Sequence, residues 1–213
     1  MSSSSVHLIF FSCVSRNDTH RLSAGARGGI GSAAAQLCKI RGARVFGTYT
    51  SLAKVTPPPY VTPIELTSNT AIRDAIAKEG LSNKIDVLLD CAGYEHPFND
   101  ALVTMTPDGS GRVVVMAVHA KDGFFPIDMR TFYTKALVLK GMKSSILNSA
   151  EIKAFLDMLS KQIDNDVFQG PQAVTTVDIK DTIAVTGALK DILTRSSPVR
   201  SVIVPQSTND PVL

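Results

Sequence analysis

A chain of 213 residues, of which 44% are hydrophobic, is long enough to bury a substantial core, and this excludes an intrinsically disordered protein. The net charge is +3 and the basic residues form no stripe of the kind that follows a phosphate backbone, so a nucleic-acid partner is not expected. The three cysteines, Cys13, Cys38 and Cys91, are odd in number and lack CxxC spacing, which argues against a disulfide framework and favours a reducing, cytoplasmic location.

The first 22 residues do not share the pattern of the rest. Their apolar stretch, VHLIFFSCV at 6–14, has no basic region before it and is too short to span a bilayer, so an ill-packed tail is favoured over a cleaved signal, and no membrane partner is expected. We expect a divergent tail at 1–22, one domain at 23–205 and a second tail at 206–213.

From Gly28 onward, segments with helical and strand-like spacing alternate, which predicts a parallel sheet with helices on both faces. The first predicted helix carries one apolar stripe, made of Ile30, Ala34, Leu37 and Cys38. Further helices are predicted at 69–79, 98–105, 128–136 and 150–163, and in a last helix whose Ile179, Ile183, Leu189 and Leu193 share a face. Strands are predicted at 44–50, 60–66, 85–93, 111–118, 137–143 and 198–205.

Two local patterns add detail. The near-continuous apolar run at 85–93 is typical of a central strand buried on both faces. Asn148, with Glu151 three residues later, predicts a capping box for the helix at 150–163.

Residues 26–31, ARGGIG, have the spacing A-x-G-x-x-G of a dinucleotide-binding turn. Such a turn links a strand to a helix whose free backbone N–H groups meet a pyrophosphate. Gly28 would allow close approach of the phosphate, and Gly31 would allow close packing of the helix on the sheet. Small-residue turns also occur for packing alone, but the α/β alternation after this one favours a nucleotide site.

The end of the next strand bears on the choice of cofactor, because an acidic residue there would bind the ribose 2′-hydroxyl of NAD. The chain has Thr50, Ser51 and Lys54 in this region and no carboxylate before Glu65. Hydroxyls and a cation suit a 2′-phosphate, which favours NADP(H), although ordinary turn residues would look the same.

Several blocks, in order, resemble the medium-chain dehydrogenase/reductase superfamily, in its quinone-oxidoreductase-like and zinc-type alcohol-dehydrogenase-like branch. They are GARGGIGSAAAQLCKIRGARVFGTYTS, KIDVLLDCAG, LVTMTPDGSGRVVVMA and PIDMRTFYTKALVLKGM, and the resemblance covers 23–205. It implies a doubly wound, mostly parallel α/β Rossmann domain that binds NADP(H) and serves hydride transfer to or from a small-molecule enone, quinone, aldehyde or alcohol.

The resemblance also implies residue roles. It puts Gly28, Gly29 and Ile30 at the pyrophosphate, between Ala26 and Gly31. It implies that Thr50, Ser51 and Lys54 surround the adenosine phosphate, and that the nicotinamide ribose lies beside Cys91, Ala92, Gly93 and Val118.

The departures from the family concern the N-terminal region. Family members carry a GroES-like domain before the Rossmann half, and it supplies most of the substrate pocket and, in zinc enzymes, the metal ligands. Only 22 residues stand there in this chain, none resembles that domain, and we expect no metal site from Cys13, His7 and His20. THRLSA replaces the apolar first strand, and burying Arg21 or His20 would cost several kcal/mol. Our interpretation is a truncation or a misplaced exon boundary before Leu22.

No residue is assigned as a proton donor. His96 and His119 are expected on the ligand side, where loop histidines are usually only solvated. Cys91 has no base near it in the sequence, and Tyr133 and Lys135 lack the spacing of a Tyr-x-x-x-Lys dyad. Two functions stay open: an NADPH-dependent oxidoreductase, and a non-catalytic NADP-binding remnant that acts with a partner polypeptide. The segment LVLKGMK could also pair with its twin in a homodimer.

Overall fold

The computed structural model describes residues 20–53, 55–120, 122–143, 148–165, 167–169, 174–194 and 200–204. The chain divides into two compact units, Met1–Gln162 and Ile163–Leu213, and each is described by itself. Within the described ranges, no helix has the length and apolar character needed to cross a membrane. Lys54 and the segment VHLIFFSCV lie outside the described residues.

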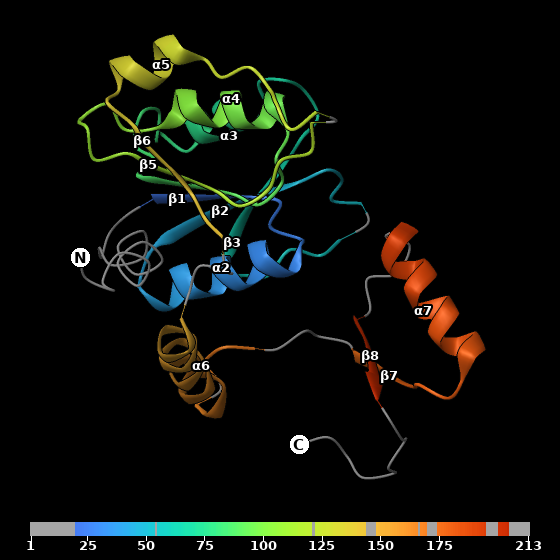
Figure 1. Ribbon diagram of the computed structural model, residues 1–213. Helices are drawn as coiled ribbons and strands as arrows, with labels where there is room; N and C mark the ends of the chain where they lie inside the picture. The colour runs from blue at the N-terminus through green and yellow to red at the C-terminus, as the bar shows by residue number, and fades with distance from the viewer. Residues whose placement is uncertain are drawn as a thin grey trace. The chain divides into compact units, whose positions relative to one another are not determined.

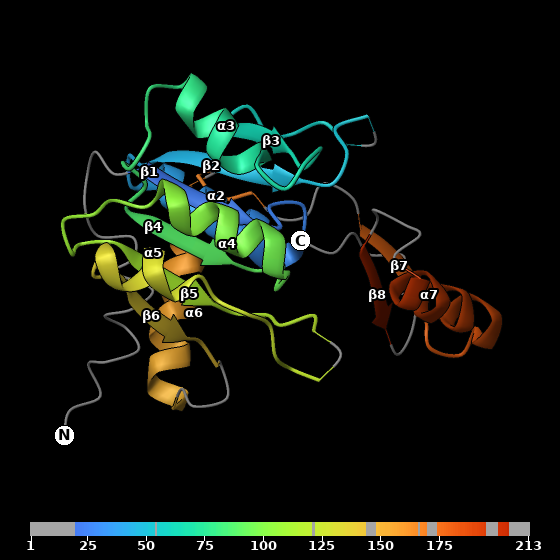
Figure 2. The same cartoon turned by 90° about the horizontal axis from the view of Figure 1, so that it is seen from above.

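The first unit is built on a six-stranded parallel sheet of order β3-β2-β1-β4-β5-β6. Its strands are β1 (His20–Ala24), β2 (Arg44–Tyr49), β3 (Val61–Glu65), β4 (Val87–Asp90), β5 (Arg112–Val115) and β6 (Val138–Gly141). Its helices are α2 (Gly29–Ile40), α3 (Ala71–Lys78), α4 (Glu95–Thr104), α5 (Met129–Thr134) and α6 (Ser149–Asp164). Helix α2 covers one face of the sheet, and α3, α4 and α5 lie on the other (Figure 1, and from above in Figure 2). The predicted doubly wound α/β fold is therefore confirmed.

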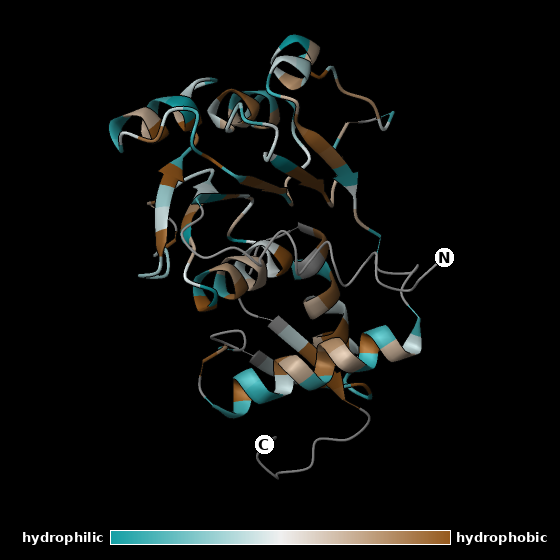
Figure 3. Ribbon diagram, turned by 90° about the vertical axis from the view of Figure 1, so that its left-hand side faces the viewer, coloured by the Kyte–Doolittle hydropathy of each residue, from teal (hydrophilic) through white to brown (hydrophobic). Residues whose placement is uncertain are grey.

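The core has two parts, one on each face of the sheet. On the side of α3 and α4, buried side chains from helices and strands pack together, among them Leu22, Phe46, Ile72, Leu88, Phe98 and Val113. On the side of α2, a second cluster contains Ala34, Cys38, Val45, Val87 and Leu89. The helices carry both hydrophobic and hydrophilic residues (Figure 3), as expected when only one side of each helix packs on the sheet.

Helix α2 departs from the predicted stripe at its first turn. Ala34, Leu37 and Cys38 are buried as expected, but the side chain of Ile30 is 59% exposed. Ile30 lies at the edge of the sheet, beyond the end of β1, where the described residues do not cover it. The apolar character of Ile30 is therefore not explained by the core.

Strand β1 forms at the centre of the sheet in spite of its polar sequence, HRLSA. Leu22 and Ala24 alternate into the core on the side of α4, while Arg21 and Ser23 point to the opposite face. Arg21 is buried, with 1% exposed, and is paired in register with Val45 on β2 and Val87 on β4. The apolar residues at alternate positions therefore specify the strand, whereas the burial of the charged Arg21 side chain destabilises it.

The second unit contains β7 (Val174–Asp178), α7 (Thr182–Thr194) and β8 (Arg200–Val204), and its two strands are parallel. The sequence pattern missed β7. It also placed Ile179 in the last helix, which is wrong: Ile179 precedes α7, and its N–H donates to the Val204 carbonyl at 2.8 Å, extending the ladder. The single domain at 23–205 stays a prediction.

The predicted capping box of α6 is confirmed. The N–H of Asn148 donates to the Glu151 carboxylate, and the N–H of Glu151 donates to Asn148 Oδ1, both at 3.0 Å. Helix α4 begins three residues before its predicted start, at Glu95, with Pro97 in its first turn, where a missing N–H costs nothing.

Candidate functional site

The loops that follow β1 and β4 meet at the carboxyl edge of the sheet, where the strand order reverses. Gly25 has a φ of +74°, and a Cβ on it would lie 3.3 Å from the Cβ of Ala92, so the two loops are in contact. The N–H of Gly25 donates to Thr48 Oγ1 at 2.9 Å, which ties the loop to the end of β2. Ligands of open α/β sheets bind in the crevice at this point.

Two glycines of the loop have different physical roles. A Cβ on Gly31 would lie 2.3 Å from the Gly25 carbonyl oxygen, so the packing of α2 on the loop requires glycine at this position. Gly28 is exposed and has an ordinary extended conformation (φ −66°), and a Cβ on it would lie 3.4 Å from Gly25 O. The fold alone would therefore accept a side chain at Gly28.

The N-terminus of α2, which follows the loop after β1, has no side-chain cap. Its N-cap residue, Gly28, has no side chain to accept a hydrogen bond, and the first turn contains no acidic residue. The first backbone N–H groups of a helix lack partners within the helix and carry a partial positive charge. This arrangement suits an anionic group.

Three other loop residues divide into packing and exposed positions. Ala26 is buried, and its methyl group fills the space in front of Gly47, where an added Cβ would lie 2.7 Å away. Gly29 and Ile30 are exposed at the start of α2. Ala26 therefore supports the turn, whereas Gly29 and Ile30 are accessible to a ligand.

The end of β2 is closed by a carboxylate that the sequence pattern did not assign to this place. Thr50 is exposed and Ser51 half-buried, and the N–H of Leu52 donates to Glu65 Oε1 at 2.8 Å. Glu65 reaches this turn because it pairs in register with Tyr49 on the neighbouring strand. Only the parallel pairing of β2 with β3 could have predicted this contact, and that prediction needs the register between the two strands.

At the end of β4, a buried carboxylate holds the turn. Asp90 Oδ1 accepts the N–H groups of Ala92 (3.1 Å) and Gly93 (2.9 Å), while Oδ2 finds no hydrogen-bond partner among the described residues. Burial raises the pKa of Asp90, and the two backbone bonds oppose that shift. Burial, helped by Asp90 and Cys38, raises the pKa of Cys91 to about 12, so this thiol is not an activated nucleophile.

The backbone of the turn after β4 is in close contact with the segment that follows β5. Gly93 has a φ of +69°, and a Cβ on it would lie 2.6 Å from the carbonyl carbon and oxygen of Ala117. The N–H of His119 donates to the Gly93 carbonyl at 2.8 Å. Val118, between these two contacts, is exposed.

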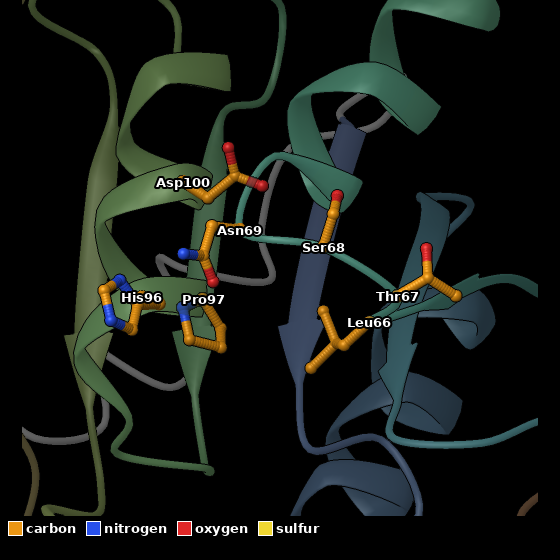
Figure 4. A pocket seen from close by; sticks show the side chains of 7 residues that line it. All are labelled: Leu66, Thr67, Ser68, Asn69, His96, Pro97 and Asp100. Atoms are coloured by element: carbon orange, nitrogen blue, oxygen red, sulfur yellow. The ribbon is translucent and has the colours of Figure 1, made fainter.

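A pocket of about 270 Å³ lies farther along the same edge, between the segment after β3 and the start of α4. Its lining consists of Leu66, Thr67, Ser68, Asn69, His96, Pro97 and Asp100, in two groups that face each other (Figure 4). Asp100 is buried and accepts the N–H groups of Ile72 (2.8 Å) and Arg73 (3.2 Å), so it caps α3. The sequence pattern did not indicate this pocket, because it joins segments from two elements.

Other candidates have structural roles. Tyr49 is buried in the cluster on the side of α2, so its ring is part of the core and is not exposed to a ligand. Lys135 Nζ donates to the carbonyls of Val103 (2.7 Å) and Met105 (2.6 Å) at the end of α4, and burial lowers its pKa. The described part of the chain contains no group of three His, Cys, Asp or Glu side chains that could hold a metal ion.

Comparison with known proteins identifies one matching family and many solved structures with a similar fold. A search of curated proteins gives no match. Similar solved structures include CurA in complex with NADPH from Vibrio vulnificus, with a TM-score of 0.70 at 13% identity, covering 95% of this chain and 61% of that one. A quinone oxidoreductase from Pseudomonas syringae has a TM-score of 0.69 at 18% identity, covering 89% of this chain and 57% of that one. A putative alcohol dehydrogenase from Sinorhizobium meliloti has a TM-score of 0.68 at 23% identity, covering 92% of this chain and 51% of that one.

At these low identities, the TM-scores show a shared fold and no more, and the chain spans between 51% and 61% of the length of the three structures. The sequence profile of the zinc-binding dehydrogenases matches residues 29–161, which is more than half of the chain. The chain therefore belongs to the zinc-binding dehydrogenase family, within the medium-chain dehydrogenase/reductase superfamily.

Proposed function

We propose that the chain binds NADP(H) at the carboxyl edge of its six-stranded sheet and is the cofactor-binding part of an oxidoreductase. The observation that carries the proposal is the contrast between Gly31, where packing leaves no room for a Cβ, and Gly28, where the fold leaves room. Packing accounts for the first glycine only. A pyrophosphate bound at the N-terminus of α2 accounts for the second, because a side chain would stand between backbone and phosphate.

The other predicted contacts suit this placement. Gly29 and the exposed Ile30 would meet the pyrophosphate side of the cofactor, with Ala26 and Gly31 supporting the turn from below. Across the crevice, the nicotinamide ribose would lie beside Cys91, Ala92, Gly93 and Val118.

The adenosine half would lie over β2 and β3. The hydroxyls of Thr50 and Ser51, with Lys54, would receive a 2′-phosphate. Glu65, on β3, also has its carboxylate near this region. This carboxylate accepts a hydrogen bond from the Leu52 N–H and so is already used to hold the turn. The pocket between Leu66 and His96 lies on this side of the crevice and would hold the adenine ring.

When bound, NADPH supplies a hydride, and the protein has to bind and orient the cofactor and exclude water. We propose an enone, quinone, aldehyde or alcohol as the small-molecule substrate. The described residues do not fit a zinc ion, so no step through zinc is derived. A cytoplasmic location and a homodimer formed through β6 belong to the same proposal.

An alternative is a non-catalytic NADP-binding protein that acts with a partner polypeptide. It is supported by Cys91 at the end of β4, whose thiol has its pKa raised to about 12 by burial and is therefore not an activated nucleophile. Binding of the cofactor without turnover would favour this second function.

The experiment is a fluorescence titration of the purified chain with NADPH and NADH, followed by NADPH oxidation assays with 2-cyclohexenone, 1,4-benzoquinone and hexanal. The matched variant is Gly28→Asp, because aspartate is a good N-cap residue and the fold accepts a side chain there. We expect unchanged or higher thermal stability and a loss of NADPH affinity of more than about tenfold from charge repulsion. If wild type binds neither nucleotide, or if Gly28→Asp binds NADPH like wild type, the proposal fails.

A further inference from the structure

Two aromatic rings stand together at the ends of β4 and β5. Tyr94 and His119 are stacked, with ring centroids 4.8 Å apart and an interplanar angle of 10°. Tyr94 is 49% exposed and His119 is exposed as well, so the pair is not part of the core. Neither side chain is part of the core clusters or of the cofactor contacts described above.

The backbone beneath the two rings is fixed by close contacts. His119 is anchored by its N–H to the Gly93 carbonyl, and Gly93 has no space for a Cβ beside Ala117. Asp90 holds the same turn from below through the N–H groups of Ala92 and Gly93. The stacked pair is therefore positioned before any ligand arrives, which lowers the entropic cost of binding one.

The place of the pair relative to a dinucleotide follows from the topology and rests on the proposed function. A pyrophosphate at the N-terminus of α2 lies at the switch between β1 and β4, so the adenosine half extends over β2 and β3. The nicotinamide half must then extend over the ends of β4 and β5. Tyr94 and His119 are the first aromatic residues that follow β4 and β5 along the chain.

We propose that the nicotinamide ring of bound NADP(H) stacks on the open face of the His119 imidazole, whose other face is covered by Tyr94. His119 is then a cofactor-contacting residue, and Tyr94 is a positioning residue that keeps the imidazole in the plane required. Stacked ring pairs add modestly to affinity, so losing the contact corresponds to a weakening of about threefold to tenfold.

The test compares two probes on the full chain: NADPH, and adenosine 2′,5′-bisphosphate, which carries only the adenosine end. We expect His119→Ala and Tyr94→Ala to weaken NADPH about threefold to tenfold and to leave the bisphosphate within about twofold. His119→Phe and Tyr94→Phe keep a stacked ring and should retain NADPH affinity. The change in nicotinamide fluorescence on binding should be present in wild type and reduced in His119→Ala.

His20→Gln is the matched control, because His20 lies at the start of β1, on the opposite edge of the sheet. The inference is overturned if His119→Ala binds NADPH like wild type, if both probes weaken equally, or if His119→Phe loses as much affinity as His119→Ala. It is also overturned if wild type binds NADPH no more tightly than the bisphosphate, a result that leaves the adenosine site intact. Failure of both probes to bind wild type defeats the proposed function together with this inference.

Discussion

At the residue scale, the packing of α2 on the loop after β1 depends on the missing Cβ of Gly31. Alanine normally stabilises a helix interior by about 1 kcal/mol relative to glycine. At Gly31 the added Cβ would lie 2.3 Å from Gly25 O and 3.1 Å from Ala26 Cα, and both are backbone atoms that cannot rotate away. We expect Gly31→Ala to lower the free energy of unfolding by about 1–3 kcal/mol in urea denaturation.

The control for this prediction is Gly187→Ala, another helical glycine, where an added Cβ would meet nothing within 4 Å. This variant should keep or gain stability, by about 0.5–1 kcal/mol. Equal effects of the two substitutions would contradict the packing argument.

Asp90 makes stability depend on pH in a defined direction. Its pKa is raised in the folded state, chiefly by burial, so folding favours the protonated form. Stability from this group is therefore present below the unfolded-state pKa and is lost as pH rises through the folded-state pKa. Asp90→Asn keeps an oxygen to accept the Ala92 and Gly93 N–H groups without the charge.

We accordingly expect the stability of Asp90→Asn relative to wild type to increase as the pH is raised from 3 to 7, measured by thermal denaturation at each pH. Asp90→Ala, which removes both backbone bonds, should be less stable than Asp90→Asn throughout. An advantage of Asp90→Asn that shrinks with rising pH would show that the carboxylate is stabilised in the fold.

At the scale of elements, β1 shows that a central strand tolerates a charged residue when the alternate positions are apolar. Arg21 is buried between Val45 and Val87, and burying a charge carries a desolvation cost even when the group has interactions. We expect Arg21→Met, of similar volume, to be as stable as wild type or up to about 3 kcal/mol more stable in urea denaturation. In contrast, Leu22→Ala should lose about 2–5 kcal/mol, because Leu22 is fully buried in the core. A loss of more than about 1 kcal/mol in Arg21→Met would mean that the strand depends on the guanidinium.

The elements differ in how well their sequences predicted them. Helix α2 follows the predicted helical spacing, and β4 forms within its predicted apolar run but covers only Val87–Asp90 of the range 85–93. Strand β1 looked damaged because only Leu22 and Ala24 carry its pattern, and β7 was missed because VTTVD has few apolar residues. Ile30 matched the helical stripe but is exposed, since periodicity does not tell where a helix extends past the sheet.

At the scale of the whole molecule, the parallel topology brings the ends of β1, β2, β4 and β5 to one edge of the sheet. The glycine spacing, together with the α/β alternation that follows it, predicted the loop at this edge. The contacts of Glu65 with Leu52 and of Tyr94 with His119 were not predictable, because each joins segments whose distance depends on strand register and on loop conformation.

The outer strand of the sheet leads to a prediction about assembly. Strand β6 is an edge strand with exposed side chains, including Val138 and Leu139. The N–H groups of Val138 and Met142 donate to Gly111 and Val115 of the β5 side, so alternation directs the Leu139 N–H to the open edge. An open edge of this kind can pair with a second copy of the strand.

We therefore expect light scattering to give wild type a mass of about twice the 22.8 kDa of one chain. Leu139→Pro removes an N–H from the open edge without removing a bond to β5, so this variant should remain folded and have the mass of a single chain. Leu139→Thr keeps the N–H and introduces a β-branched side chain that favours a strand, and it should stay dimeric. A wild-type mass of 22.8 kDa, or an unchanged dimer in Leu139→Pro, would exclude pairing through β6.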